Sequence, residues 1–266
     1  MILFGIFNVT SDSFSDGGEF LEPLLAEKKG HELIKSGAGV IDISAQSSNV
    51  NAIQIEPQLE WSRLDGLIQK FQASGYKISV DTYKPFVIQK CIQAKVSYLN
   101  NINSFRDKES LEILSENKNS LPELILMFSH NNGDFAEANS NLTPETIMNS
   151  IYRFFDNKIN ELQRIGIPES KIIFDPGMGL FLGSDPILSI EVLKNISVFK
   201  KRYGKVLISV SRKSFIGNLL DGIPPRERAA GTLAVELYLY QKQIDFIRTH
   251  DVLQLSQAMK IWDLLG

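Results

Sequence analysis

Short apolar runs alternate with longer amphipathic segments along the whole chain, and this pattern predicts alternating strands and helices. The predicted strands are apolar on both faces, as expected of parallel strands covered by helices, and lie at 2–7, 40–43, 77–80, 97–99, 124–128, 171–174, 206–210 and 246–248. The predicted helices carry apolar residues at three- and four-residue spacing and lie at 24–36, 59–73, 84–94, 108–116, 143–165, 186–203, 226–241 and 252–264.

This succession of strand–helix units within 266 residues matches the usual size of a TIM (β/α)8 barrel. A doubly wound open α/β sheet uses the same alternation and remains the alternative fold. No Ser/Gly/Pro-rich linker and no block of charges interrupts the pattern. We therefore predict an α/β protein, a TIM barrel that forms a single domain over residues 1–266.

Composition excludes several classes of protein. Lys and Arg number 28 against 31 Asp and Glu, so the net charge is −3 and no global basic field favours nucleic acid. Cys91 is the single cysteine, which excludes an intramolecular disulfide and a multi-cysteine metal site. No apolar run approaches the roughly 18 residues of a membrane span. We expect a soluble cytoplasmic protein that contacts neither nucleic acid nor membrane.

Each predicted strand runs into a polar or charged residue, and in a barrel these strand ends meet at one rim. The acids and amides Asp81, Asn100 and Asp175 follow middle strands, whereas the cations Lys213, Arg248 and His250 follow the last two strands. Loops at the last two strands frequently bind phosphate. The division favours a substrate with a donor-rich neutral head and an anionic tail. The alternative is that Asp81 or Asp175 pairs with Lys213 in a buried structural network.

Five motifs spread over nearly the whole chain resemble those of the dihydropteroate synthase family, in its order and at its spacing. They are Phe7-Asn8-Val9-Thr10-Ser11-Asp12-Ser13-Phe14-Ser15-Asp16-Gly17-Gly18, Ser79-Val80-Asp81-Thr82-Tyr83-Lys84-Pro85, Asp175-Pro176-Gly177-Met178-Gly179, Ser211-Arg212-Lys213-Ser214-Phe215-Ile216-Gly217 and Arg248-Thr249-His250-Asp251-Val252. The resemblance implies a homodimeric TIM barrel. It also implies the condensation of 6-hydroxymethyl-7,8-dihydropterin pyrophosphate with p-aminobenzoate in folate biosynthesis, which yields 7,8-dihydropteroate and pyrophosphate.

The resemblance also implies roles for individual residues. It assigns the pterin to Asp81, Asn100, Asp175 and Lys213, of which Asp81, Asp175 and Lys213 are also the catalytic set, and the carboxylates stabilise developing positive charge. It assigns pyrophosphate to Asn8, Arg248 and His250, together with a Mg²⁺ ion held by Asn8. It assigns p-aminobenzoate to Ser48, Phe181 and Ser214.

Several positions depart from the family pattern. In the second loop, Asn49 stands where the family usually has arginine, and Asn101 stands where it usually has aspartate. The stretch 178–184 is about two residues longer than in typical chromosomal enzymes. The loop and the longer stretch resemble the sulfonamide-resistant (Sul-type) subset, which implies reduced sulfonamide sensitivity. Two alternatives stay open, namely a catalytically lapsed pterin-binding paralogue and a pterin-dependent methyltransferase.

Overall fold

The computed structural model describes the chain except for residues 10–22, 47–53 and 132–135. Eight parallel strands form one sheet in the order β6-β5-β4-β3-β2-β1-β8-β7. Their bounds are β1 (Ile2–Asn8), β2 (Val40–Ser44), β3 (Ile78–Asp81), β4 (Tyr98–Asn101), β5 (Glu123–Met127), β6 (Ile172–Asp175), β7 (Leu207–Ile208) and β8 (Phe246–Thr249). β1 pairs with both β2 and β8, so the first and last strands are neighbours.

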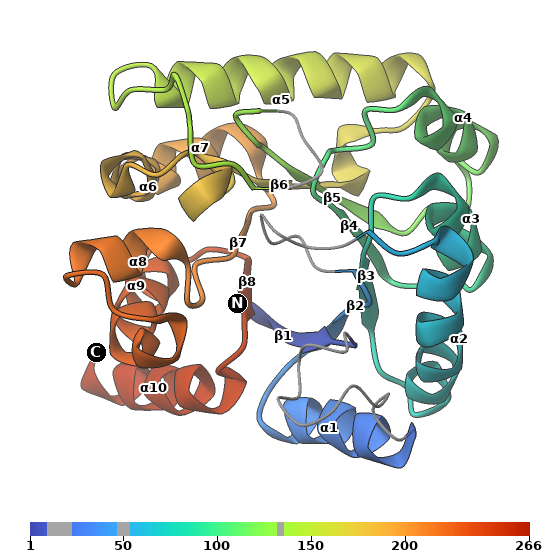
Figure 1. Ribbon diagram of the computed structural model, residues 1–266, viewed down its shortest axis with the longest axis horizontal. Coiled ribbons are helices and arrows are strands. Elements are labelled where there is room, and N and C mark those ends of the chain that lie inside the picture. Colours follow the sequence, from blue (N-terminus) through green and yellow to red (C-terminus); the bar gives the residue numbers. More distant parts are fainter. Residues whose placement is uncertain (10–22, 47–53, 132–135) are drawn as a thin grey trace.

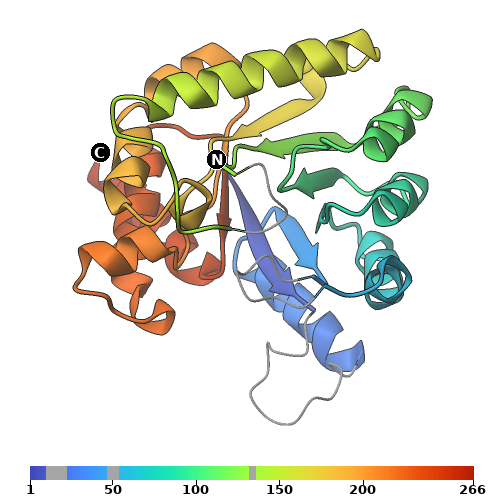
Figure 2. The same cartoon turned by 45° about the horizontal axis from the view of Figure 1, so that its top comes forward.

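The sheet closes into a barrel at the junction of β6 and β7. A parallel bridge joins Phe174 to Val206, and the Phe174 N–H donates to the Lys205 carbonyl at 3.0 Å. The strands form a ring and the helices surround it (Figure 1), which the tilted view also shows (Figure 2). The prediction of a single-domain TIM barrel is confirmed, and the open-sheet alternative is wrong.

The helices follow the predicted segments closely. They are α1 (Pro23–Lys35), α2 (Pro57–Ala73), α3 (Pro85–Gln93), α4 (Lys108–Glu116), α5 (Ile147–Arg164), α6 (Pro186–Lys194), α7 (Ile196–Tyr203), α8 (Ser214–Leu219), α9 (Ala229–Gln241) and α10 (Val252–Leu265), with short 3₁₀ turns η2 (Glu169–Lys171), η3 (Gly179–Phe181) and η4 (Pro225–Glu227). No helix in the described part of the chain is long and apolar enough to cross a membrane.

The helix predicted over 186–203 is two helices, because the chain breaks at Asn195. The Asn195 side chain donates to the Glu191 carbonyl at 2.9 Å and to the Glu191 carboxylate at 2.8 Å. An asparagine that bonds the preceding turn in this way competes with continued helix formation. The prediction also missed α8, whose six residues are too few to show helical periodicity.

The interior of the barrel is apolar at the amino-terminal end of the strands. One buried cluster takes side chains from seven of the eight strands, so these side chains meet inside the ring: Phe4, Val40, Tyr98, Ile125, Ile173, Leu207 and Phe246. The Phe4 ring packs edge-on against Tyr98 and Phe246, with centroids 5.0 and 5.6 Å apart. This layer fills the barrel toward the amino-terminal end of the strands, and active sites of TIM barrels lie at the opposite, carboxyl end.

Candidate active site

The polar residues of the rim point into the same barrel interior as the apolar layer, two residues further along each strand. Side chains two apart on a strand point to the same side. Asp42 follows Val40, Asn100 follows Tyr98, Met127 follows Ile125, Asp175 follows Ile173 and Arg248 follows Phe246, each two residues later. Asp81 lies opposite Asn100 in the register of β3 with β4. The alternation of the strands therefore brings Asp81, Asn100, Asp175 and Arg248 together, as the sequence predicted.

Arg248 connects two carboxylates across the top of the barrel. Its Nε donates to Asp42 Oδ2 at 2.6 Å and its Nη2 donates to Asp81 Oδ2 at 2.8 Å. The Asp42 side chain is fully buried, and those of Arg248 and Asp81 are only 16% and 13% exposed. Among the described residues, Asp42 Oδ1 has no hydrogen-bond partner, so within this part of the chain the carboxylate depends on Arg248 for charge compensation.

This cluster sets the ionisation of its members. The pKa of Asp81 is raised to about 7, chiefly by burial; the Arg248 and Lys213 charges oppose this rise, and the carboxylates of Asp42 and Glu60 add to it. Burial lowers the pKa of Arg248, but Asp42 and Asp81 offset this and hold it above its usual range. Asp81 can thus exchange a proton near neutral pH while Arg248 stays charged.

Asp175 and Lys213 form the second charged part of the site. Asp175 Oδ1 accepts the Gly177 N–H at 2.9 Å. Burial raises the pKa of Asp175 to about 6, against the opposing effects of the Gly177 N–H and Lys213. Burial lowers the pKa of Lys213 to about 8. The Lys213 Nζ lies 4.6 Å from the Phe181 ring centroid, a cation–π contact.

Lys213 is not part of a closed ion-pair network. It forms no ion pair with the residues that the structure describes, and Asp81 pairs with Arg248 instead. The Lys213 charge nevertheless lowers the pKa of both Asp175 and Asp81, so their neutralisation by Lys213 in a buried network stays a hypothesis. A charged ammonium and the Asp175 carboxylate are left facing the same interior.

The turn after β6 requires glycine. Gly177 has φ +74°, and a Cβ there would lie 2.3 Å from the Phe128 carbonyl oxygen. The absence of a side chain lets the turn pack on the end of β5 and place the Gly177 N–H against Asp175. Gly177 of the Asp175-Pro176-Gly177-Met178-Gly179 motif thus positions a carboxylate.

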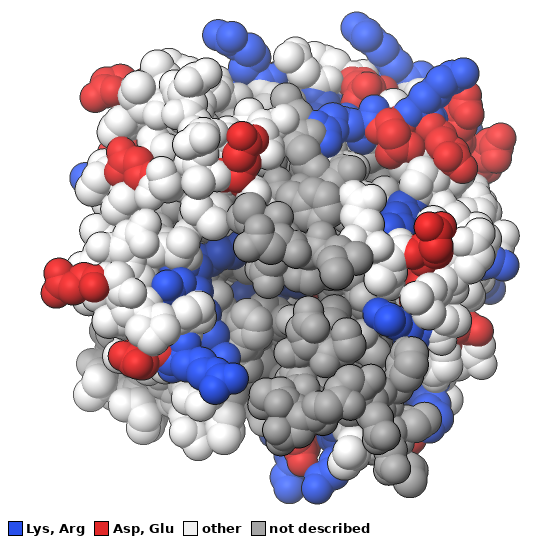
Figure 3. All heavy atoms as spheres, in the orientation of Figure 1, with Lys and Arg blue, Asp and Glu red and all other residues white. Residues whose placement is uncertain are grey.

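The remaining predicted residues lie around this centre. Asn8 ends β1 and is half-buried. His250 is exposed, and its Nδ1 forms a hydrogen bond of 3.0 Å with Ser211 Oγ. Phe181 is buried in η3, and Ser214 begins α8 directly after Lys213. Ser48 lies outside the described residues. Figure 3 shows several Lys and Arg side chains on the side of this face that α8, α9 and α10 form.

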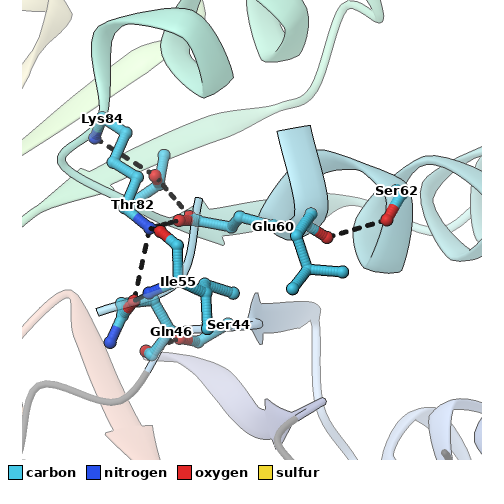
Figure 4. Close-up of polar contacts among 8 residues, drawn as sticks. Ser44, Gln46, Ile55, Glu60, Ser62, Thr82 and Lys84 are labelled. Carbon is cyan, nitrogen blue, oxygen red and sulfur yellow. Dashed lines mark hydrogen bonds and ion pairs between the residues drawn. The ribbon is translucent and has the colours of Figure 1, made fainter. Parts of the chain in front are cut away.

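Sequence reasoning missed a second buried ion pair beneath the rim (Figure 4). Lys84 Nζ lies 2.8 Å from Glu60 Oε2, and both side chains are at most 9% exposed. Thr82 donates its hydroxyl to Glu60 Oε1 at 2.7 Å, and Lys84 also donates to Gln46 Oε1 at 3.3 Å and to the Ile55 carbonyl. The pair ties the backbone after Asp81 to α2. The available signal was Glu60 on the apolar side of a predicted helix.

An apolar surface borders the charged groups. Ile102, Met127 and Phe181 form a small buried cluster, and Tyr83 packs against it. Ile102, Phe181 and Tyr83 follow β4, β6 and β3, and Met127 ends β5, so all four lie at the carboxyl end of the strands with Asp175 and Asn100. The site thus combines carboxylates, an amide and cations with apolar walls, which suits a flat heterocycle with N–H donors. Within the described ranges, no three His, Cys, Asp or Glu side chains are grouped to hold a metal.

Comparison with known proteins agrees with this chemistry. The sequence model of the family described as "Pterin binding enzyme" matches residues 4–250. The fold and the site therefore define a pterin-binding enzyme on a barrel scaffold.

Individual relatives narrow the class. "Dihydropteroate synthase type-3" of Escherichia coli is 42% identical over 99% of this chain and 99% of its own length. "Dihydropteroate synthase type-2" of the same organism is 37% identical over 98% and 94%. The dihydropteroate synthase of Yersinia pestis, solved with a sulfonamide drug, superposes with a TM-score of 0.88 at 29% identity over 99% and 94%. That of Xanthomonas albilineans, solved with 4-aminobenzoic acid, gives 0.86 at 27% identity over 99% and 92%. The chain belongs to the dihydropteroate synthase family.

The raised pKa of Asp175 predicts a pH-dependent effect of Asp175→Asn on stability. A carboxyl whose folded-state pKa exceeds its unfolded value of about 3.9 binds protons more readily in the native state, so its contribution to stability falls as pH rises between about 4 and 6. The variant keeps an oxygen for the Gly177 N–H. Relative to the parent, Asp175→Asn should therefore gain stability across this window, by about 3 kcal/mol at most above pH 6.

Urea unfolding at several pH values measures this effect. Asp185→Asn is the matched control, because Asp185 is an exposed N-cap of α6 and asparagine also caps helices. A difference between Asp175→Asn and the parent that stays the same from pH 4 to pH 8 would contradict the assigned ionisation.

Proposed function

We propose that the protein condenses 6-hydroxymethyl-7,8-dihydropterin pyrophosphate with p-aminobenzoate, releasing 7,8-dihydropteroate and pyrophosphate. The observation that carries the proposal is the convergence of Asp81, Asn100 and Asp175 with Lys213 and Arg248 at the carboxyl end of the barrel. The relatives support it, since their described activity is that of dihydropteroate synthases over nearly the full length of both chains.

Pterin recognition rests on the two aspartates. A pterin offers paired N–H donors, and a carboxylate accepts such a pair well. Asp175 keeps one oxygen on the Gly177 N–H, and Asp81 shares one oxygen with Arg248, so each has a second oxygen for the substrate. When pyrophosphate leaves, positive charge develops on the pterin methylene, and fixed negative charge in a water-poor barrel stabilises it.

Asn8, His250 and Arg248 are the groups proposed for the pyrophosphate end. Mg²⁺ usually binds through one or two protein oxygens plus substrate phosphates, and the half-buried Asn8 side chain, without a hydrogen bond to the described residues, fits such a place. Bound there, the ion would neutralise charge on the leaving group. Arg248 is shared with two aspartates, so its field acts on the whole site.

Phe181 and Ser214 are the described residues proposed to border p-aminobenzoate; Ser48, also proposed, lies outside the described part. Both border Lys213, one through its ring and one as the next residue in the chain. A neutral arylamine is already nucleophilic and needs little help from a base. Orientation beside the pterin methylene is therefore the main contribution of these side chains.

We propose reduced sulfonamide sensitivity from the longer stretch 178–184. Within it Phe181 is buried, its ring lies against Lys213, and its carbonyl accepts the His130 N–H at 2.9 Å. Phe181 is thus packed between the loops after β5 and β7 rather than turned outward. Its bulk leaves less room for a group that extends beyond the outline of p-aminobenzoate.

We propose that the protein acts as a homodimer through α9 and α10. In α9, Leu233, Val235 and Leu237 lie only half-buried, and in α10 Ile261 and Trp262 are exposed. A helix that is apolar around most of its circumference needs cover on more than one side. A second copy of the same surface supplies that cover.

Turnover tests the proposed reaction, and Lys213→Met tests the site. The protein, incubated with the pterin pyrophosphate, p-aminobenzoate and Mg²⁺, should release dihydropteroate and pyrophosphate in equal amounts. Lys213→Met should lower kcat/KM by about 100-fold or more, the usual loss when a charge-stabilising group is removed. Lys90→Met is the control, because Lys90 also lies over a ring, Phe86, but on α3.

Each failure has a distinct meaning. Pterin binding without turnover would select the lapsed paralogue. Full activity of Lys213→Met would show that Lys213 is wrongly assigned.

Sulfonamide inhibition tests the longer stretch. The ratio of the sulfonamide inhibition constant to the KM for p-aminobenzoate should exceed that of the Y. pestis enzyme by at least about tenfold, and Phe181→Ala should lower it again because an aromatic ring leaves the site. Equal ratios for the two parent enzymes would exclude reduced sensitivity.

A further inference from the structure

Asn101, the position where the family usually has aspartate, is fully buried at the end of β4 and has three polar partners. Its Nδ2 donates to the Thr82 carbonyl at 3.1 Å. Its Oδ1 accepts the N–H groups of Asn103 at 3.1 Å and Phe105 at 2.9 Å. One carbonyl and two N–H groups require an acceptor on one side and a donor on the other, which an amide supplies and a carboxylate does not.

These bonds fix the chain on both sides of the pterin groups. The Thr82 N–H donates to the Asn100 carbonyl at 3.0 Å, so Thr82 is held to β4 through both its N–H and its carbonyl. Asp81 directly precedes Thr82, and Asn100 directly precedes Asn101. The side chain of Asn101 therefore sets the spacing between the ends of β3 and β4 from which Asp81 and Asn100 project.

The same amide holds a strained loop. Ser104 and Phe105 follow with φ of +56° and +51°, backbone angles that residues other than glycine rarely adopt. Both residues are fully buried, and Ser104 donates its hydroxyl to the Met127 carbonyl at 2.9 Å. The N–H of Phe105 bonds Asn101 Oδ1, so the strain is maintained by the buried amide.

Charge gives a second reason for an amide. Asp42, Asp81 and Asp175 already outnumber the cations Arg248 and Lys213 in the barrel mouth, and Asp81 has a raised pKa. A further buried carboxylate beside Thr82, whose hydroxyl already bonds Glu60, would face a carbonyl oxygen and add to this excess. Burial without a partner is the costliest setting for a charge.

We propose that Asn101 is a positioning residue that fixes Asp81 and Asn100 for pterin binding, and that this chain requires an amide there rather than a carboxylate. The inference rests on the proposed function. It concerns chiefly the pterin step, because the bonds of Asn101 go to Thr82, Asn103 and Phe105 rather than to Phe181, Ser214 or Lys213.

Asn101→Asp tests the inference through the pH dependence of KM. The carboxylate form should raise the KM for the pterin pyrophosphate by about tenfold or more, since it leaves a buried carbonyl unpaired. Its protonated form can donate to Thr82, so the ratio of variant to parent KM should fall toward one as pH falls from 8.5 to 5.5. The KM for p-aminobenzoate should change less than twofold throughout.

The other charged groups on the surrounding elements are common to both proteins, so the ratio isolates the new carboxyl: Asp81 and Lys84 around the end of β3, Glu60 on α2, Arg106 after the β4 loop and Arg248 on β8. Asn101→Ala is the matched control. It should raise the KM for the pterin pyrophosphate by a factor that does not depend on pH, because alanine has no proton to exchange.

The outcomes separate this inference from the proposed function. An inactive parent overturns the function. If the parent is active and Asn101→Asp has the same KM for the pterin pyrophosphate at every pH, the positioning role is overturned. An equal rise in the KM values for the pterin pyrophosphate and for p-aminobenzoate also overturns it. If Asn101→Asp fails to fold at pH 8, the affinity for the pterin pyrophosphate is measured by calorimetry at pH 5.5. There Asn101→Asp should bind more tightly than Asn101→Ala, and equal or weaker binding overturns the proposal.

Discussion

The ion pairs of Arg248 with Asp42 and Asp81 are the interaction on which the rest of the site depends. Asp42 is fully buried, and one of its oxygens has no partner in the described part of the chain, so the Arg248 guanidinium 2.6 Å away supplies its charge compensation there. The same guanidinium reaches Asp81 at 2.8 Å and thereby joins β2, β3 and β8 across the barrel. Breaking such a buried pair by removing one member costs about 3–5 kcal/mol. The proposed function gives a reason for this arrangement, because the charged cluster is the part that we propose to meet the substrate.

The charged site lies directly above the apolar layer that fills the amino-terminal end of the barrel. Phe4, Tyr98 and Phe246 fill the interior below it with edge-on aromatic contacts, which excludes water from beneath the charges. The polar groups that come next on the same strands therefore lie in a medium of low dielectric, where the pKa of Asp175 rises to about 6 and that of Lys213 falls to about 8. Burying these charged groups lowers the stability of the fold. In return, the charges have fixed positions, which is what the proposed reaction requires.

Local rules in the sequence predicted the barrel and most of the rim, but they left some contacts out. Alternation with a period of two places Asp175 and Arg248 inside once the strands are recognised. It cannot show that Arg248 bonds Asp42, which lies 206 residues away, because that depends on the pairing of β8 with β1 and of β1 with β2. The Lys84–Glu60 pair was missed because it depends on how α2 packs beside the end of β3, which no local pattern shows. The break at Asn195 and the short α8 were missed because side-chain bonds and a six-residue helix leave no periodic signal.

The most direct test of the account compares Arg248→Met with the double variant Arg248→Met/Asp42→Asn. Unfolding free energy and affinity for the pterin pyrophosphate are measured for both. Arg248→Met should lose about 3–5 kcal/mol of stability, and Asp42→Asn should restore a large part of it by removing the uncompensated charge. Pterin affinity should stay lost in both variants. A double variant that is no more stable than Arg248→Met, or pterin affinity that survives Arg248→Met, would contradict the central role of this interaction.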